Sequence, residues 1–183
     1  MAYRIALTGG IGTGKTYLSK HFVEMGIPVF YADDEAKKLY NDPEFVSLLA
    51  DNFGPVILDC NGRLNFKKFS EVIFKNENNL LKINELVHPK VMKLFEKWME
   101  SQTAFAVMME SAIVFEGGLE HYFDKIIVAD APLELRIHRI MMRNPEWSRE
   151  EILLRISRQL PQEEKCRRAD LVVCTGETYK ESR

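Results

Sequence analysis

The chain has 183 residues, of which 46% are hydrophobic and 28% are charged, and its formal net charge is −2. That composition is typical of a globular protein of one domain, and so small a net charge gives no sign of a nucleic-acid or membrane partner. The three cysteines are too scattered for a disulfide framework or a zinc site, and no apolar run reaches the roughly 18 residues of a membrane span. We therefore expect a cytoplasmic protein.

The first predicted strand, 3–8, leads into a glycine-rich turn and then into a helix over 15–25. The turn reads GGIGTGKT over 9–16, which matches the P-loop pattern G-x-x-x-x-G-K-[ST]. Glycines let successive backbone N–H groups point inward and form a nest for anionic oxygens, and the helix N-terminus adds further donors. We expect Lys15 to reach the β- and γ-phosphates of a nucleotide and the Thr16 hydroxyl to hold Mg²⁺.

The predicted phosphate-binding residues of this loop are Gly10, Gly12, Thr13, Gly14, Lys15 and Thr16. The alternative is a glycine-rich turn that binds nothing. The position of the motif between a strand and a helix favours phosphate binding, because the motif needs that context to function.

A second short strand is predicted over 29–32, and it ends at Asp33 and Asp34. Asp33 is open to two interpretations. It is either the carboxylate that accepts a proton from an attacking hydroxyl, or the N-cap of a helix that begins at Glu35. Asp34 is the better cap by position, which leaves Asp33 available for chemistry.

The stretch 35–88 is predicted to be helical and to contain no convincing buried strand. Apolar residues recur there at helical spacing, and turn-forming residues separate the segments. The predicted helices cover 35–40, 45–53, 66–74 and 80–87, with a polar loop over 76–79. Such a stretch indicates a helical insertion between two strands of a sheet.

His88 and Pro89 separate the helix that ends at Val87 from a predicted helix over 90–101. Two interpretations stay open for the pair. They contact a substrate, or they are only a helix start with its preceding loop.

Three further strands are predicted in the second half of the chain, over 103–109, 125–129 and 171–173, and the first two are expected to be buried. A helix over 132–142 and a helix reaching residue 159 lie between the last two. Short apolar strands that alternate with helices predict an α/β fold, a three-layer doubly wound parallel sheet. Ligands of such sheets gather at the carboxyl ends of the strands, where this chain has its P-loop, Asp33, Glu110 and Asp130.

Glu110 directly follows a predicted strand and could reach Mg²⁺, directly or through water. The alternative is a strand-end charge that faces solvent. Asp130 has the same kind of position but weaker support for a role.

Eight of the eleven arginines lie between residues 136 and 168, where nine basic residues face five acidic ones. Arg136, Arg139 and Arg143 share one helix face, and guanidinium groups stabilise the charge of a transferring phosphoryl group. The alternative is a solvated helix face with ion pairs to the nearby residues Glu146, Glu150 and Glu151. We expect solvation for most of the eight and a functional contact for one or two.

Several segments together resemble the dephospho-CoA kinase family, in order and spacing, over nearly the whole chain. The segments are 6–16 (ALTGGIGTGKT), Ala32-Asp33, 86–89 (LVHP), Glu110 with Phe115-Glu116, and 155–159 leading to Ala169-Asp170. The resemblance implies ATP-dependent phosphorylation of the ribose 3′-hydroxyl of dephospho-CoA, the last step of coenzyme A synthesis. It also implies a fold like that of nucleoside monophosphate kinases, with Mg²⁺ and ATP bound at the P-loop.

By the same resemblance, 1–183 is a single P-loop kinase domain with a helical CoA-binding insertion over 35–88 and a mobile lid over 139–165. Asp33 aligns with the family's proposed general base and Arg139 with its phosphate-contacting lid arginine. His88 and Pro89 fall in the acceptor-binding part. We expect dephospho-CoA and ATP as partners, no nucleic acid, no membrane, and a monomer or weak homo-oligomer.

The chain departs from the family pattern at three positions of the site. Tyr31 stands where the family usually has a first aspartate, Glu110 replaces a more typical aspartate, and Tyr17 replaces a small hydroxyl residue. The backbone N–H of Tyr17 is still expected to meet the α-phosphate.

Two rival functions stay open. The first is another small-molecule or nucleotide kinase of the same fold. The second is a switch NTPase, which would need a guanine-reading N-K-x-D stretch that the sequence lacks.

Overall fold

The computed structural model describes residues 2–176, except for the side chains of Phe74 and Glu77, and these residues form two compact units. The first unit contains the chain up to Tyr31 together with the chain from Met99 onward, and the second unit is Ala32–Trp98.

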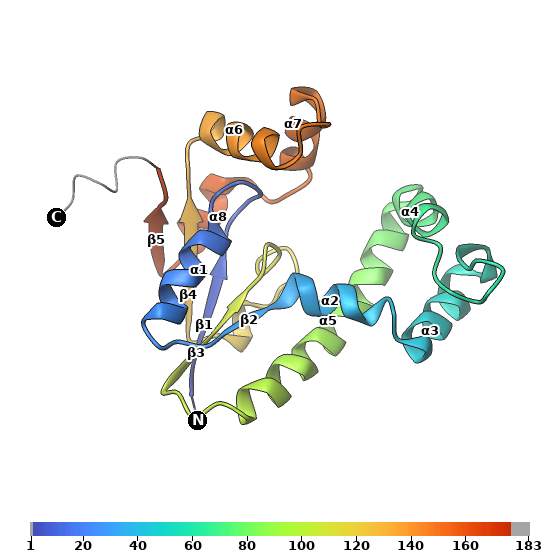
Figure 1. Ribbon diagram of the computed structural model, residues 1–183, viewed down its shortest axis with the longest axis horizontal. Helices are drawn as coiled ribbons and strands as arrows, with labels where there is room; N and C mark the ends of the chain where they lie inside the picture. The colour runs from blue at the N-terminus through green and yellow to red at the C-terminus, as the bar shows by residue number, and fades with distance from the viewer. Residues whose placement is uncertain (1, 177–183) are drawn as a thin grey trace. The chain divides into compact units, whose positions relative to one another are not determined.

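A parallel sheet forms the centre of the first unit (Figure 1), and its strands are ordered β2-β3-β1-β4-β5. The strands are β1 Tyr3–Thr8, β2 Val29–Tyr31, β3 Ala106–Glu110, β4 Lys125–Asp130 and β5 Leu171–Cys174. All five residues of β3 are buried, as expected for an apolar strand with neighbours on both sides. The sequence therefore predicted the α/β fold and its parallel sheet correctly.

The register of the sheet aligns the ends of its strands. Glu110 at the end of β3 pairs with Leu7 of β1 on one side and with Tyr31 of β2 on the other. Asp130 at the end of β4 pairs with Cys174 of β5. The carboxyl ends of all the strands consequently meet at the edge from which the P-loop emerges.

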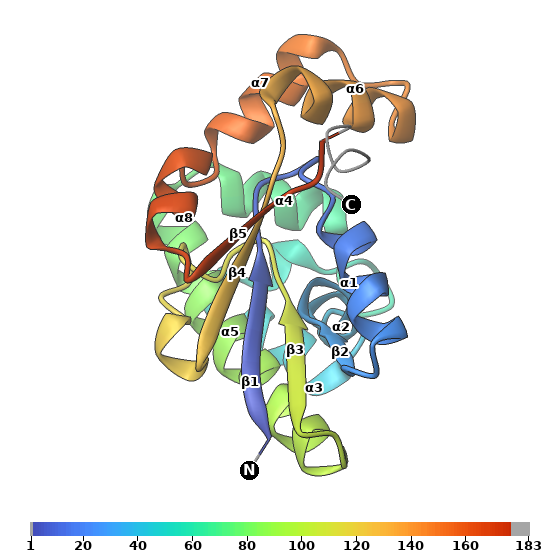
Figure 2. The same ribbon diagram turned by 90° about the vertical axis from the view of Figure 1, so that its left-hand side faces the viewer.

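Helices flank this sheet. Those of the first unit are α1 Lys15–Glu24, α6 Leu133–Arg143, α7 Arg149–Ser157, α8 Gln162–Arg168 and the 3₁₀ turn η2 Glu120–Tyr122. Helices α1 and α8 lie on opposite sides of the sheet (Figure 2). Leu18 and Phe22 of α1 pack on a buried cluster that includes Leu7, Met108 and Ile127. Burial of these apolar faces fixes the P-loop between β1 and α1.

Helix α7 begins with a capping box. The Ser148 hydroxyl accepts from the Glu151 N–H, and the Glu151 carboxylate accepts from the Ser148 N–H. Ile152 of α7 packs against Ile137 and Ile140 of α6.

The chain between these two helices and β5 was predicted incompletely. Helix α7 ends at Ser157, before the predicted residue 159, and α8 was not predicted at all. Helix α8 has seven residues, and its one apolar residue is a cysteine, so its sequence shows no helical periodicity of apolar residues. The Lys165 side chain of α8 is nevertheless fully buried, and its Nζ lies 2.6 Å from Glu116 Oε1 and donates to the Ala112 carbonyl. Burial of a paired charge, which periodicity does not reveal, holds this helix in place.

The second unit is helical, as predicted for 35–88. Its elements are α2 Ala32–Leu39, α3 Pro43–Phe53, the 3₁₀ turn η1 Pro55–Ile57, α4 Phe66–Phe74 and α5 Glu77–Glu100, of which the last two residues belong to the first unit. Phe45, Leu49 and Ile57 are fully buried in it. Its assignment to acceptor binding stays a prediction.

The start of α2 differs from the prediction. The helix begins at Ala32 and not at Glu35, so Asp33 and Asp34 both lie in its first turn. The capping interpretations of Asp33 and Asp34 are therefore wrong. Acidic residues in a first helical turn are favoured by the helix dipole, which explains why this turn tolerates three of them, Asp33, Asp34 and Glu35.

Helix α5 runs through two predicted interruptions. It begins at Glu77, so most of the predicted loop 76–79 is helical, and Pro89 lies in its interior. A proline inside a helix costs roughly 3 kcal/mol, which is why the sequence predicted a break. Val87 and Val91 on either side of Pro89 are buried, and their packing offsets this cost.

Within residues 2–176, no helix combines the length and the apolar character that a bilayer crossing requires.

Candidate active site

Gly12 and Gly14 are two of the P-loop positions that require glycine. Gly12 and Gly14 have φ angles of 82° and 88°, in the left-handed region. A Cβ at Gly12 would lie 2.7 Å from the Arg136 carbonyl oxygen, and one at Gly14 would lie 3.0 Å from Thr175 Oγ1. Gly14 is also the N-cap residue of α1 and has no side chain to cap it, so the first N–H groups of this helix face outward for an anion.

The Lys15 ammonium lies against the backbone of its own loop. Its Nζ donates to the Gly9 carbonyl at 2.8 Å and to the Gly10 carbonyl at 3.3 Å. These two carbonyls set the place from which the lysine can reach a phosphate oxygen.

Glu110 connects the P-loop with the end of β3. Its two carboxylate oxygens accept from the hydroxyls of Thr16 and Ser19, each at 3.0 Å, and the residue is only 8% exposed. The alternative of a solvent-facing charge is therefore wrong. Ser19 Oγ also lies 3.4 Å from the hydroxyl of Tyr31, the residue that replaces the family's first aspartate.

These oxygen atoms suit Mg²⁺ in a particular way. Among the described residues, no group of three or more histidines, cysteines and carboxylates could hold a metal ion by itself. Mg²⁺ commonly binds through one or two protein oxygens together with substrate phosphates. Thr16 and Glu110 fit such a site, in which the nucleotide phosphates would supply the remaining ligands.

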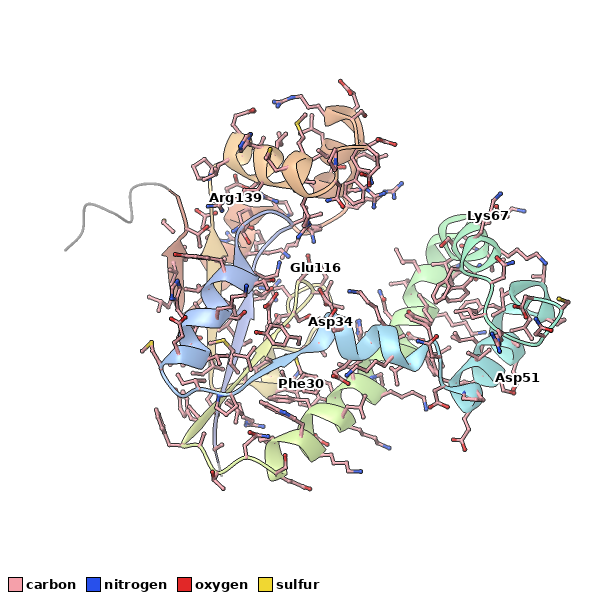
Figure 3. All side chains as sticks on the ribbon, in the orientation of Figure 1. Phe30, Asp34, Asp51, Lys67, Glu116 and Arg139 are labelled. Carbon is pink, nitrogen blue, oxygen red and sulfur yellow. The ribbon has the colours of Figure 1, made fainter. Side chains whose placement is uncertain are left out.

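Arg139 of α6 lies against the P-loop (Figure 3). Its Nη1 donates to the Gly12 carbonyl at 3.4 Å and to Thr175 Oγ1 at 3.0 Å, and Nη2 donates to the Thr175 carbonyl. Thr175 directly follows β5 and its hydroxyl also donates to the Thr13 carbonyl. The predicted lid arginine is thus in contact with the loop.

Arg136 is the second arginine at the loop. It is only 5% exposed, and its Nε donates to the Ile11 carbonyl at 3.0 Å. Burial away from water lowers the pKa of this guanidinium from its usual value.

Other arginines of the cluster are on the surface, as expected for most of them. Arg149, Arg167 and Arg168 form ion pairs with Glu134, Glu164 and Glu120, which are not the predicted partners. The Arg155 guanidinium stacks over the Trp147 ring.

Two glutamines that the sequence did not single out as site residues bind the first half of the loop. Gln162 Oε1 accepts from the Gly10 N–H at 2.9 Å, and Gln159 Oε1 accepts from the Ile11 N–H at 2.8 Å. About 150 residues separate each glutamine from the loop residue that it contacts, so no local sequence pattern could predict these contacts.

The remaining predicted residues belong to the second unit. Asp33 is exposed and lies two positions beyond the last residue of β2. His88 lies inside α5, and its Nε2 atom is buried without a hydrogen-bond partner among the described residues. Burial lowers the pKa of this imidazole. Pro89 is exposed.

The lowered pKa of His88 predicts a pH-dependent stability. Below its ordinary pKa of 6.5 the unfolded chain takes up a proton that the folded chain resists, so the free energy of unfolding should fall as the pH drops from about 6.5 toward the folded pKa. Urea unfolding between about pH 5 and pH 7 measures this slope. His88→Gln should flatten it, whereas the matched change at the exposed His138 should leave it as it is. An equal slope in wild type and His88→Gln would contradict the prediction.

A family model described as dephospho-CoA kinase matches residues 3–181. The chain belongs to the dephospho-CoA kinase family. The resemblance seen in the sequence is thereby confirmed.

Individual relatives and solved structures agree with this membership. The dephospho-CoA kinase of Fusobacterium nucleatum is 35% identical over 169 residues, which cover 92% of this chain and 87% of that protein. The crystal structure of TT1252 from Thermus thermophilus matches with a TM-score of 0.86 at 30% identity, covering 98% of this chain and 91% of the other. The dephospho-CoA kinase structure from Campylobacter jejuni matches with a TM-score of 0.69 at 26% identity over the same shares.

Proposed function

We propose that this protein transfers the γ-phosphate of ATP to the ribose 3′-hydroxyl of dephospho-CoA, which gives coenzyme A and ADP. Membership of the dephospho-CoA kinase family supports this reaction. The arrangement that carries the proposal is the P-loop lysine, the Thr16 hydroxyl and the Glu110 carboxylate around one helix N-terminus.

ATP is bound by charge and by backbone donors. The N–H groups of Gly12, Thr13, Gly14 and the first turn of α1, including Thr16 and Tyr17, donate hydrogen bonds to the phosphate oxygens and so form a nest for them. Lys15 moves from the loop carbonyls to the β- and γ-phosphates, and Arg139, already beside Gly12, adds a second positive charge. Gly10 orients the carbonyl that holds Lys15.

Magnesium belongs to this proposal because Thr16 and Glu110 suit it. Thr16 and Glu110 would hold Mg²⁺ together with the nucleotide, and the ion would supply positive charge against the charge that develops on the phosphates. Glu110→Gln keeps the hydrogen-bonding shape but removes the charge. It should raise the Mg²⁺ concentration at half-maximal velocity about tenfold. An unchanged Mg²⁺ dependence in initial-rate assays would exclude Glu110 from the site.

The acceptor is handled by the second unit. Asp33 serves as the general base that accepts the proton of the attacking 3′-hydroxyl, a role for which its exposed position in the first turn of α2 leaves it accessible. The helical insertion 35–88 docks dephospho-CoA, and His88 and Pro89 contribute to that surface. The segment 139–165 closes as a lid over the phosphates.

The proposal includes a cytoplasmic location and an oligomeric state for the protein. Cys60, Cys166 and Cys174 are free thiols, which is typical of a reducing cytoplasm. We expect a monomer or weak homo-oligomer without nucleic-acid or membrane partners, and light scattering during gel filtration tests the oligomeric state.

An acceptor screen tests the function. Coupled ADP release should appear with dephospho-CoA and stay at background with AMP, CMP and nucleosides. Turnover with a nucleoside or nucleotide and not with dephospho-CoA would favour the rival kinase, and ADP release independent of any acceptor would favour a switch NTPase.

A further inference from the structure

We propose that Gln159 and Gln162 are positioning residues for the P-loop lysine, which they orient through two peptide planes. This inference rests on the nucleotide-binding part of the proposed function and deepens it. It concerns the chain between α7 and α8, which no motif connects with Lys15.

The first peptide plane joins Gly9 and Gly10. Gln162 accepts from its N–H, and Lys15 Nζ donates to its carbonyl at 2.8 Å. A trans peptide is planar, and its N–H and C=O point in opposite directions. The glutamine that holds one end of this plane therefore aims the other end at the lysine.

The second plane, between Gly10 and Ile11, repeats this arrangement. Gln159 accepts from the Ile11 N–H at 2.8 Å, and the Gly10 carbonyl accepts from Lys15 Nζ at 3.3 Å and from Thr13 Oγ1 at 2.9 Å. Two successive planes thus have a glutamine on the N–H side and Lys15 on the carbonyl side.

Gln162 is itself fixed at the end of β4. Its Nε2 donates to the Ala129 carbonyl and to Asp130 Oδ1, each at 3.0 Å, which leaves Oε1 directed at the Gly10 N–H. The Ala129 carbonyl and the Asp130 carboxylate can only accept hydrogen bonds, and the Gly10 N–H can only donate one. The three contacts are therefore satisfied together only when Nε2 of the Gln162 amide faces β4 and Oε1 faces the loop. Helix α8, which begins with Gln162, lies beside β4 (Figure 2).

The loop has little room to turn away from this clamp. A Cβ added at Gly10 would come within 2.4 Å of Arg136 Nη2 and within 3.2 Å of Gln162 Oε1. These close approaches leave the Gly9-Gly10 and Gly10-Ile11 planes little room to rotate, and the carbonyls of the two planes set the starting place of Lys15. Because both glutamines lie where the α6–α7 segment returns to the sheet, that segment and the lysine are coupled.

A double-mutant cycle on ADP binding tests this coupling in the full chain. Gln159→Met and Gln162→Met each remove one hydrogen bond to the loop, and Gln162→Met also removes the two contacts of its Nε2 at the end of β4. Each variant should weaken Mg·ADP binding roughly fivefold to tenfold. In a Lys15→Met background the same changes should alter the Kd for ADP less than about twofold, because their effect passes through the lysine.

Ser148→Ala is the control, because it removes the cap of α7 in the same segment. It should lower the melting temperature and leave the Kd for ADP unchanged. If Gln162→Met fails to fold, the Gln159→Met cycle decides alone, because the contact of Gln159 is to a single loop N–H.

The proposal would be overturned if the glutamine substitutions changed the Kd for ADP equally with and without Lys15, because the glutamines would then stabilise the loop independently of the lysine. Single variants that bind ADP normally would also overturn it. ADP binding requires no acceptor. A chain that passes this test but phosphorylates something other than dephospho-CoA would therefore refute the proposed function and leave the coupling intact.

Discussion

Replacing Asp33 by asparagine should lower kcat at least about a hundredfold while ATP binding is retained. Asparagine has the shape of aspartate and can still orient a hydroxyl, but it cannot accept the proton at neutral pH. General base catalysis typically contributes 10²- to 10⁴-fold, and the loss should therefore fall in that range. Steady-state rates with dephospho-CoA, together with calorimetric titration of ATP, measure both quantities.

Asp34→Asn is the matched control. Asp34 lies next to Asp33 in the first turn of α2, and its carboxylate forms an exposed ion pair with Lys37 at 2.8 Å. Exposed pairs of this kind contribute little, so this variant should keep nearly full turnover. Near-normal kcat in Asp33→Asn, or an equal loss in both variants, would remove Asp33 from its assigned role.

Replacing Lys15 by methionine should lower kcat about 10²- to 10³-fold and weaken ATP binding as well. Methionine fills the space of the lysine stem but carries no charge to place on the β- and γ-phosphates. The hydrogen bonds that Lys15 makes to the loop carbonyls are also lost, so the planes at Gly9 and Gly10 would be held by the two glutamines and by Thr13.

Lys20→Met provides the comparison, since Lys20 is exposed on the same helix, α1. It should leave kcat and the KM for ATP near their wild-type values. Unaltered kinetics in Lys15→Met would be incompatible with a phosphate-binding P-loop.

The sequence predicted those features that local patterns encode. The P-loop is a contiguous motif, and its strand and helix follow from a few neighbouring residues, so its position was predicted correctly. The apolar strands that end at Glu110 and Asp130 were recognised for the same reason. The assignment of Asp33 and of His88-Pro89 came from family resemblance and stays a prediction about their roles.

The features that the sequence did not predict depend on long-range contacts. Pro89 was expected to break a helix, but packing of Val87 and Val91 keeps α5 continuous. Helix α8 has no apolar periodicity and is held by the buried Lys165. Gln159 and Gln162 reach the P-loop from about 150 residues away, and such contacts exist only once the chain has folded.

The proposed reaction transfers a phosphoryl group to one hydroxyl of one acceptor. Purified protein should be incubated with dephospho-CoA and ATP labelled in the γ-phosphate, and the product should be examined by mass spectrometry and phosphorus NMR. We predict a single labelled product with the phosphate on the ribose 3′ oxygen, identical to coenzyme A. Label on another oxygen, on another acceptor or only in inorganic phosphate would contradict the account.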